Sequence, residues 1–217
     1  MAAIEEDVIL NPTRGAMNTA ASNPGCVRAR LTTVLRCYPH LAVFPVLIML
    51  GGMFIAVTVT LGGDPAALLV LPICGVFAGI ILWYLFLRPK ATARSGCLLP
   101  AVVVDGDSSL VAAVSNLSKL GGKDDHVKVF KAPLKRSGQG SIEAGKKCPV
   151  VALYEDANPR SASWSNFLPY PVVCLTDVRA THDRVLKQIP PEDWQELKTA
   201  LRQIERPFRP GLYPVQV

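Results

Sequence analysis

Residues 41–61 read LAVFPVLIMLGGMFIAVTVTL and residues 66–87 read AALLVLPICGVFAGIILWYLFL, and neither run contains an Asp, Glu, Lys, Arg or His side chain. An α-helix rises about 1.5 Å per residue, so a run of about 20 apolar residues spans the hydrocarbon core of a bilayer. Because backbone groups in lipid must bond internally, we predict a transmembrane helix over each run. The connection at 62–65, GGDP, has the composition of a tight turn. The sequence therefore predicts a transmembrane helical hairpin.

The charged residues beside these runs predict how the hairpin lies in the membrane. Basic residues flank both runs, whereas the turn carries only Asp64. By the positive-inside rule, both termini lie in the cytoplasm and the turn lies outside. We therefore expect a two-pass protein of the plasma (inner) membrane, with a basic linker at 88–95 after the second helix. The flanking basic residues are Arg28, Arg30, Arg36, Arg88, Lys90 and Arg94.

A pair of glycines in the second run, Gly75 and Gly79, has the spacing that lets another helix approach closely. This pair predicts either a homodimer or packing against the first helix, which contains Gly51 and Gly52. Neither run contains the ionisable groups that transporters place inside the membrane, so a transport function is disfavoured. A hairpin buried in a soluble core is the alternative, although helices of soluble proteins normally carry a polar face.

The composition of the chain indicates a folded protein. Its 217 residues suffice for one domain or two small ones, and with 50% hydrophobic and 18% charged residues it is not a disordered solvating protein. Residues 1–40 lack a sustained hydrophobic period, and we predict a disordered, basic cytoplasmic tail there. Residues 88–217 hold 19 basic and 13 acidic side chains, so the charge of this segment equals the net charge of the whole chain, +6. This excess suits an anionic bilayer but is too scattered to predict nucleic-acid binding.

Residues 96–217 predict an independent α+β domain. Apolar runs between turn residues predict strands over 98–104, 109–117, 126–131, 149–154 and 171–175. Five short strands indicate a barrel-like or strongly curved antiparallel sheet. Two C-terminal helices follow, one over 180–188 and one from 190, where prolines and acidic residues suit a first turn. The second helix carries an apolar stripe that we expect to pack on the sheet rather than bind a partner. The stripe comprises Trp194, Leu197, Leu201 and Ile204.

The sequence shows no motif for catalysis or for binding a metal or cofactor. Its six cysteines form no C-x-x-C pair, and no histidine stands at a metal-ligand spacing. Segment 140–147 nearly matches a phosphate-binding loop, but Lys147 replaces the hydroxyl residue that binds magnesium. We therefore expect no catalytic residue, cofactor, metal or identifiable small-molecule substrate. A cysteine–histidine pair formed in space through His126 or His182 stays open.

A cluster of basic residues in two predicted strands and their connecting loop is the main candidate site. If this part of the domain faces the bilayer, each basic residue near the surface contributes about 1 kcal/mol of attraction to anionic head groups. An ordinary solvated hairpin is the alternative. The candidate residues, for the membrane surface or a protein partner, are Lys128, Lys131, Lys135, Arg136, Lys146 and Lys147.

Four stretches resemble a known family. They are GCLLPAVVV at 96–104, CPVVALY at 148–154, FLPYPVVCLTD at 167–177 and IPPEDWQEL at 189–197. Together they are similar to an uncharacterised bacterial family, domain of unknown function 3239, often joined to a two-helix membrane anchor. The resemblance covers about residues 95–205. It implies no activity and therefore assigns no functional residues.

These observations favour a non-enzymatic inner-membrane protein whose cytoplasmic domain binds a protein partner or the anionic membrane surface. One alternative is an enzyme at the membrane face whose site is not visible in the sequence. Another is a small structural subunit of a membrane complex, with Gly75 and Gly79 at the interface between helices. A pocket with several titratable groups of shifted pKa would favour the enzyme.

Overall fold

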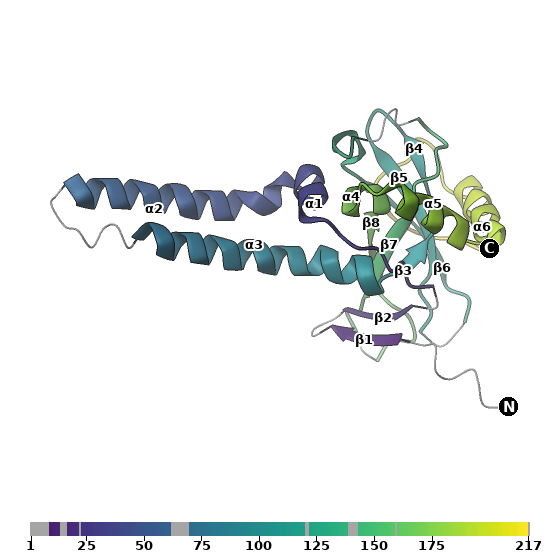
Figure 1. The fold of residues 1–217 in the computed structure, drawn as a ribbon. Helices are drawn as coiled ribbons and strands as arrows, with labels where there is room; N and C mark the ends of the chain where they lie inside the picture. Colours follow the sequence, from purple (N-terminus) through teal and green to yellow (C-terminus); the bar gives the residue numbers. More distant parts are fainter. Residues whose placement is uncertain are drawn as a thin grey trace.

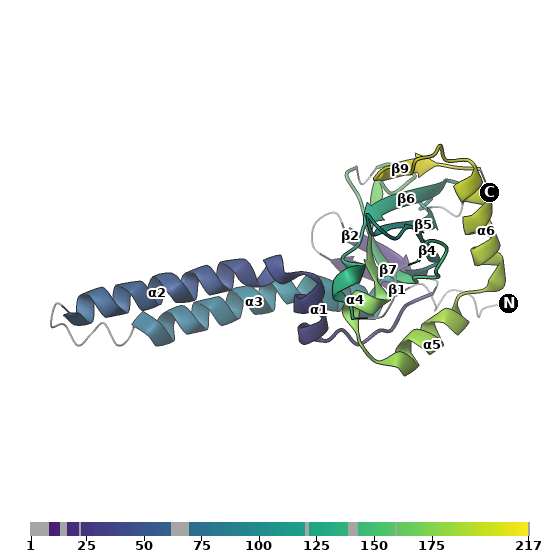
Figure 2. The ribbon, with the colours of Figure 1, turned by 90° about the horizontal axis from the view of Figure 1, so that it is seen from above.

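The computed structural model of the chain describes residues 9–13, 17–21, 23–61, 70–119, 122–138, 143–158 and 160–216. Figure 1 shows an elongated molecule in which two long helices, α2 (Val43–Leu61) and α3 (Val70–Ser95), project from an α+β domain. The same two helices lie side by side in Figure 2, and the short helices α1 (Leu31–Cys37) and α4 (Val172–Leu175) lie at the end of the domain nearest to them. The overall order of a helical hairpin followed by an α+β domain agrees with the prediction.

The hairpin consists of α2 (Val43–Leu61) and α3 (Val70–Ser95), and a short 3₁₀ helix, η1 (Pro39–Ala42), leads into α2. The apolar stretches Pro39–Thr58 and Pro72–Ser95 are both long and apolar enough to cross a membrane, and in the most apolar 18 residues of each only 17% of the residues are buried. Exposed apolar side chains surround both helices, with Phe54 71% exposed, so neither is the buried core helix of a soluble domain. The predicted turn at 62–65 lies outside the described residues.

Two antiparallel sheets form the domain. In one, β7 (Val150–Glu155) pairs with β2 and β3 along one edge and with β8 along the other. The second is ordered β4-β5-β6-β9. Both sheets are open, so the predicted barrel is not observed among the described residues. The remaining strands are β1 (Ile9–Thr13), β2 (Met17–Ala21), β3 (Cys97–Leu99), β4 (Ala101–Asp105), β5 (Leu110–Asn116), β6 (Asp125–Lys131), β8 (Asn166–Pro171) and β9 (Gly211–Pro214).

The predicted strand at 98–104 is divided between the two sheets at Pro100, which has no backbone N–H to continue a ladder. The predicted strand at 109–117 is confirmed as β5, and both of its faces are buried. Leu110 and Ala112 belong to one apolar cluster, which includes the C-terminal helices, whereas Val111 and Ala113 belong to a second. Burial of both faces explains why β5 is apolar throughout instead of alternating.

The C-terminal helices agree with the prediction as α5 (Arg179–Gln188) and α6 (Pro191–Arg202). Trp194, Leu197 and Ile204 are buried in the core, so the apolar stripe packs within the domain as expected. The predicted strand at 171–175 is wrong. The ladder of β8 ends at Pro171, where Val172 N–H donates to the carbonyl of Pro149, and the chain then forms the short helix α4 (Val172–Leu175).

Within the N-terminal region, the described residues 9–13, 17–21 and 23–40 are ordered, unlike the disordered tail that we predicted for residues 1–40. β1 and β2 pair with each other, and residues 23–38 pack into the domain. Val27 N–H donates to the carbonyl of Ala93 in α3 at 2.7 Å, and Val34 of helix α1 (Leu31–Cys37) is completely buried. The domain therefore includes chain on both sides of the hairpin, and the hairpin is an insertion within it.

Residues 88–95 form the last turns of α3 and not the linker that we predicted. Gly96 follows directly, and a Cβ at this position would lie 2.5 Å from the carbonyl oxygen of Thr92 and 2.8 Å from that of Ala152. Only glycine fits so close to two backbone oxygens. The helix therefore enters the β-sheet without a flexible segment, and this rigid connection fixes the position of the domain relative to the hairpin.

Candidate functional site

A groove of about 420 Å³, which we call the junction groove, lies where the hairpin meets the domain. One wall comes from the connection between α1 and α2, a second from α3, and a third from Tyr170 of β8. The rings of Tyr38 and Tyr170 pack edge to face across it, with centroids 5.8 Å apart. Its lining residues are Tyr38, His40, Leu41, Tyr84, Leu85, Arg88, Pro89 and Tyr170.

Two of the three tyrosines of the groove, Tyr38 and Tyr170, have pKa values raised above the ordinary value of a phenol. Desolvation raises the pKa of Tyr38 strongly, and the Tyr38 hydroxyl forms a hydrogen bond with the buried thiol of Cys174. Desolvation also raises the pKa of Tyr170, while the nearby guanidinium of Arg88 acts in the opposite direction. The groove therefore presents neutral rings beside an exposed cation. Within the described ranges, Arg88 forms no ion pair.

A second hollow of about 250 Å³ shares Tyr38 and Tyr170 with the junction groove and includes Lys131. Lys131 is exposed at the end of β6. Arg36 is on α1, and Arg136 is on the 3₁₀ helix η3 (Leu134–Arg136). The positive charges of both residues act to lower the pKa of the Cys37 thiol. We call the four exposed basic residues around the groove the junction face. They are Arg36, Arg88, Lys131 and Arg136.

The sequence identified Lys131 and Arg136 as site residues but used Arg36 and Arg88 only as flanks that orient the hairpin. Their proximity results from the insertion of the hairpin, which brings α1, α3 and η3 to one end of the domain. A sequence pattern does not contain this information, because residue 36 is far from residues 88 and 136 along the chain. The cluster of cations before the first apolar run was the available signal.

Lys128, another predicted site residue, does not face solvent freely. It is half-buried on β6, and its ammonium donates to Asn166 Oδ1 at 2.8 Å and to the carbonyl of Phe167 in β8. Desolvation lowers the pKa of Lys128, and Glu155 partly opposes that effect. Because β6 and β8 belong to different sheets, Lys128 connects the two sheets, and its side chain also lines the second hollow.

The other predicted basic residues are exposed but are distributed over more than one surface. Lys135 donates to the carbonyl of Asp107 at 2.8 Å. Lys147 places its ammonium 4.5 Å from the centroid of the Trp194 ring on α6. Together with Lys146 it lines a separate hollow beside α4 and α5. The predicted patch therefore divides, and the part that adjoins the hairpin is the junction face.

The two predicted packing glycines have different surroundings in the hairpin. A Cβ on Gly75 would lie 3.9 Å from Met49 Sδ of α2, whereas one on Gly79 would meet no atom within 4 Å. The closest approach of the helices is elsewhere, because a Cβ on Gly52 would lie 2.5 Å from Cys74 Sγ. Gly75 therefore faces the partner helix, while Gly79 faces away from every described residue.

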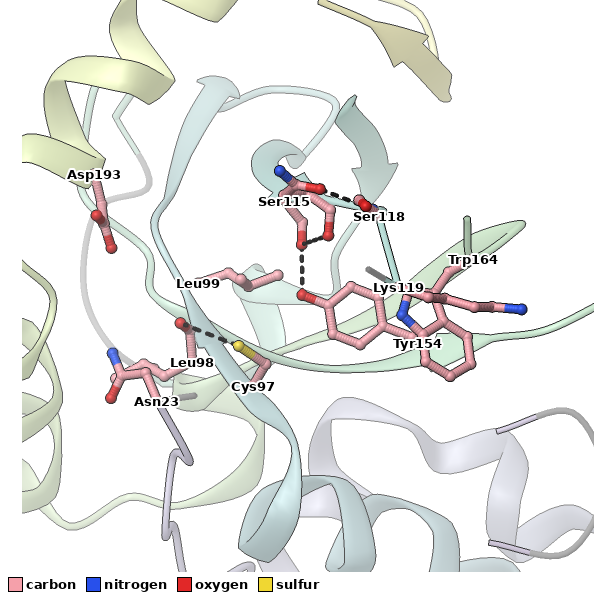
Figure 3. Close-up of a pocket in the computed structure, with 11 residues that line it drawn as sticks. Asn23, Cys97, Leu98, Leu99, Ser115, Ser118, Lys119, Tyr154, Trp164 and Asp193 are labelled. Carbon is pink, nitrogen blue, oxygen red and sulfur yellow. Dashed lines mark hydrogen bonds between the residues drawn. The ribbon is translucent and has the colours of Figure 1, made fainter. Parts of the chain in front are cut away.

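A cavity of about 510 Å³ between the sheets is a second candidate site, which the sequence did not reveal (Figure 3). The hydroxyl groups of Tyr154 and Ser115 lie 2.6 Å apart and point toward each other. At one rim, the ammonium of Lys119 pairs with Asp156 at 2.9 Å and lies 4.9 Å from the Trp164 ring. The cavity could hold a small ligand through hydrogen bonds and ring contacts.

Burial shifts three titratable groups of this cavity toward their neutral forms. Desolvation raises the pKa values of the Cys97 thiol, the Tyr154 phenol and the Asp193 carboxyl. A thiol or phenol that stays protonated is a hydrogen-bond donor rather than a nucleophile. The arrangement therefore suits binding better than covalent catalysis.

The other candidates for reactive chemistry have structural partners. His182 is buried and its Nε2 lies 2.8 Å from the carbonyl oxygen of Thr176, while His126 Nδ1 lies 3.4 Å from Asp124 Oδ1. His182 lines the same hollow as Cys148. Burial raises the pKa of the Cys148 thiol to about 12. In the described ranges, no group of three histidine, cysteine or acidic residues is arranged to hold a metal ion.

Comparisons with known proteins identify the family. A solved structure described as a "putative membrane protein from Corynebacterium diphtheriae" is similar, with 19% identity and a TM-score of 0.46, and the match covers 54% of this chain and 99% of that one. No curated protein matches the chain. The family described as "Protein of unknown function (DUF3239)" matches residues 88–205, which span α3 from Arg88 through α6. Because this match covers more than half of the sequence, the chain belongs to that family of unknown function.

Proposed function

We propose that this protein is a non-enzymatic, membrane-anchored domain that binds the anionic surface of the membrane in which its hairpin lies. The continuous path from α3 into the core carries this proposal. α3 has apolar, largely exposed side chains up to Leu87, buries Ala93 completely in the domain, and ends at Ser95. With no flexible segment between hairpin and core, the junction face stays beside the ends of the membrane helices.

The charge of the junction face supports this proposal. Its four basic residues are exposed, and none forms an ion pair within the described part of the chain. A basic residue near an anionic bilayer contributes about 1 kcal/mol, and the attraction falls off within a Debye length of about 8 Å at physiological ionic strength. Rigid placement beside the helix ends keeps these residues within that range.

The test uses the full chain in nanodiscs of phosphatidylglycerol with phosphatidylcholine, or of phosphatidylcholine alone. Hydrogen exchange at the backbone of η3 should be slower with phosphatidylglycerol, and high salt should remove the difference. The Arg36→Gln/Arg136→Gln variant should lose the difference. The Lys198→Gln/Arg202→Gln variant, which changes two exposed cations on α6, should retain it. Equal exchange in both lipid mixtures would contradict the proposal.

We also propose that both termini and the domain lie on the cytoplasmic side of the inner membrane. The basic residues near residues 28–36 and 88–94, with Asp64 between the spans, support this orientation. A C-terminal tag should be digested by protease in sealed inverted membrane vesicles without detergent. A tag that is protected until detergent is added would place the domain outside.

An enzyme at the membrane face is a second candidate, because the inter-sheet cavity holds three groups of shifted pKa. Its neutral thiol and phenol give this candidate less support than the junction face gives to membrane binding. A structural subunit of a membrane complex, or a homodimer, is a third candidate and would use Gly79. Gly79→Leu should then abolish co-purification of a partner or self-association, while Gly51→Leu, also on an open position, should not.

A further inference from the structure

The junction groove combines three features that suit one amphipathic ligand. Its volume is about 420 Å³, it is lined largely by aromatic and aliphatic side chains, and it has the exposed cation Arg88 at one side. Small-molecule sites typically enclose about 300–1,000 Å³ and place a few polar groups in an apolar wall. The groove therefore has the size and character of a binding site rather than of a packing defect.

The position of the groove determines which ligand can reach it. Its wall residues Leu41 and Leu85 adjoin the exposed apolar surfaces of α2 and α3, while Arg88 directly follows Leu87, where the uninterrupted apolar run 66–87 ends. If the hairpin spans a bilayer, as the proposed function requires, then this point lies at the level of the lipid head groups. A ligand there would have an apolar part beside the helices and an anionic part beside Arg88.

We propose that the junction groove binds one anionic phospholipid, with the phosphate on the Arg88 guanidinium and the acyl chains along Leu41 and Leu85. A guanidinium donates two parallel hydrogen bonds to a phosphate, which makes Arg88 a better phosphate ligand than a lysine. The aromatic wall formed by Tyr38, Tyr84 and Tyr170 contacts the glycerol region. This inference rests on the proposed function, but it assigns one stoichiometric lipid site instead of a general surface attraction.

Native mass spectrometry of the full chain tests this site. The protein is released from micelles that contain equal amounts of phosphatidylglycerol and phosphatidylcholine, and the lipid that remains bound is counted. The wild-type chain should retain one phosphatidylglycerol in preference to phosphatidylcholine. Arg88→Gln should lower the bound phosphatidylglycerol about tenfold, which is the effect expected for loss of a charge-assisted hydrogen-bond pair.

A matched control separates this site from net charge. Lys90→Gln removes the same charge two residues further along α3, where the ammonium lies 4.8 Å from the Trp83 ring and outside the groove, and it should leave lipid retention unchanged. Arg88→Lys should restore part of the retention. Because the Arg88 side chain is exposed, the Arg88→Gln variant should also keep the wild-type circular dichroism spectrum.

Three outcomes would overturn the inference. Equal loss of lipid in Arg88→Gln and Lys90→Gln would show a charge effect without a site. Equal retention of phosphatidylcholine would remove the requirement for an anion. Displacement of the lipid by glycerol phosphate would show that a free phosphate compound is the ligand. In each case the slower exchange of η3 in anionic nanodiscs would still test the proposed function independently.

Discussion

Val34→Ala tests whether the segment before the hairpin belongs to the core of the domain. Val34 is completely buried, and the substitution removes two methyl groups. At about 0.8 kcal/mol for each buried carbon, plus a term for the cavity left behind, the expected loss of unfolding free energy is about 2–3 kcal/mol. For a domain of this size, each kcal/mol lowers the Tm by about 3–4 °C, so the Tm should fall by about 6–12 °C.

The measurement is thermal unfolding of the full chain in detergent micelles, followed by near-ultraviolet circular dichroism, which reports tertiary packing. Thr32→Ala provides the control, because Thr32 lies on the same helix but is exposed. Its effect on the free energy of unfolding should stay within about 0.5 kcal/mol. If Val34→Ala melts like Thr32→Ala, then α1 is not part of the core and the hairpin is not inserted into the domain.

Two further substitutions test the packing of the hairpin and the inter-sheet cavity. Gly52→Ala should weaken the hairpin by about 1–3 kcal/mol, because its Cβ would lie 2.5 Å from Cys74 Sγ, and Gly51→Ala should be tolerated because no atom lies within 4 Å. Loss of helicity during titration with sodium dodecyl sulfate measures both. Tyr154→Phe should cost about 1–2 kcal/mol in thermal unfolding, because it leaves the buried Ser115 hydroxyl without its 2.6 Å partner. Adding Ser115→Ala should then cost less than the sum of the two single changes.

Regular hydrophobic patterns made much of the fold predictable. The two apolar runs predicted α2 and α3, and the alternation of polar and apolar residues over 126–131 predicted β6. The spacing of Trp194 and Leu197 gave the buried stripe of α6. In each case the signal was local, since the period of the pattern and the period of the element agree. The burial of these side chains was therefore visible before the arrangement of the elements was known.

The elements that were missed depend on contacts between distant parts of the chain. The run at 171–175 is β-branched and apolar, as in a strand, but the strand edge that it would extend ends at Val150, opposite Pro171. Residues 23–30 form irregular chain that is held to α3 by the hydrogen bond from Val27 N–H to the carbonyl of Ala93, and such bonding leaves no periodic pattern. Val27 and Val34 are widely spaced apolar residues, and their burial depends on a helix that begins 36 residues after Val34.

The candidate site was partly predictable for the same reason. The sequence placed candidate cations near β6 and η3, but it did not show which of them a second sheet would cover. Lys128 lies on β6 and bonds to the backbone of the other sheet, because β8 covers it. Arg88 is brought to the site by the tertiary fold, which places α3 beside Tyr38 and Tyr170. Charge patterns identify residues that need a polar environment, but the topology decides whether that environment is water, backbone or lipid.

The insertion of the hairpin makes the orientation of the domain and the geometry of the helices dependent on each other. The chain enters α2 from α1, whose Val34 lies in the core. It leaves α3 at position 96, where only a glycine fits beside the backbone of β7. One turn of η1 is the sole element between the buried part of α1 and α2. A change in the angle between α2 and α3 must therefore displace packed residues of the domain. A lipid held between Arg88 and Tyr170 would act where the two parts join, so its binding energy would be coupled to that angle.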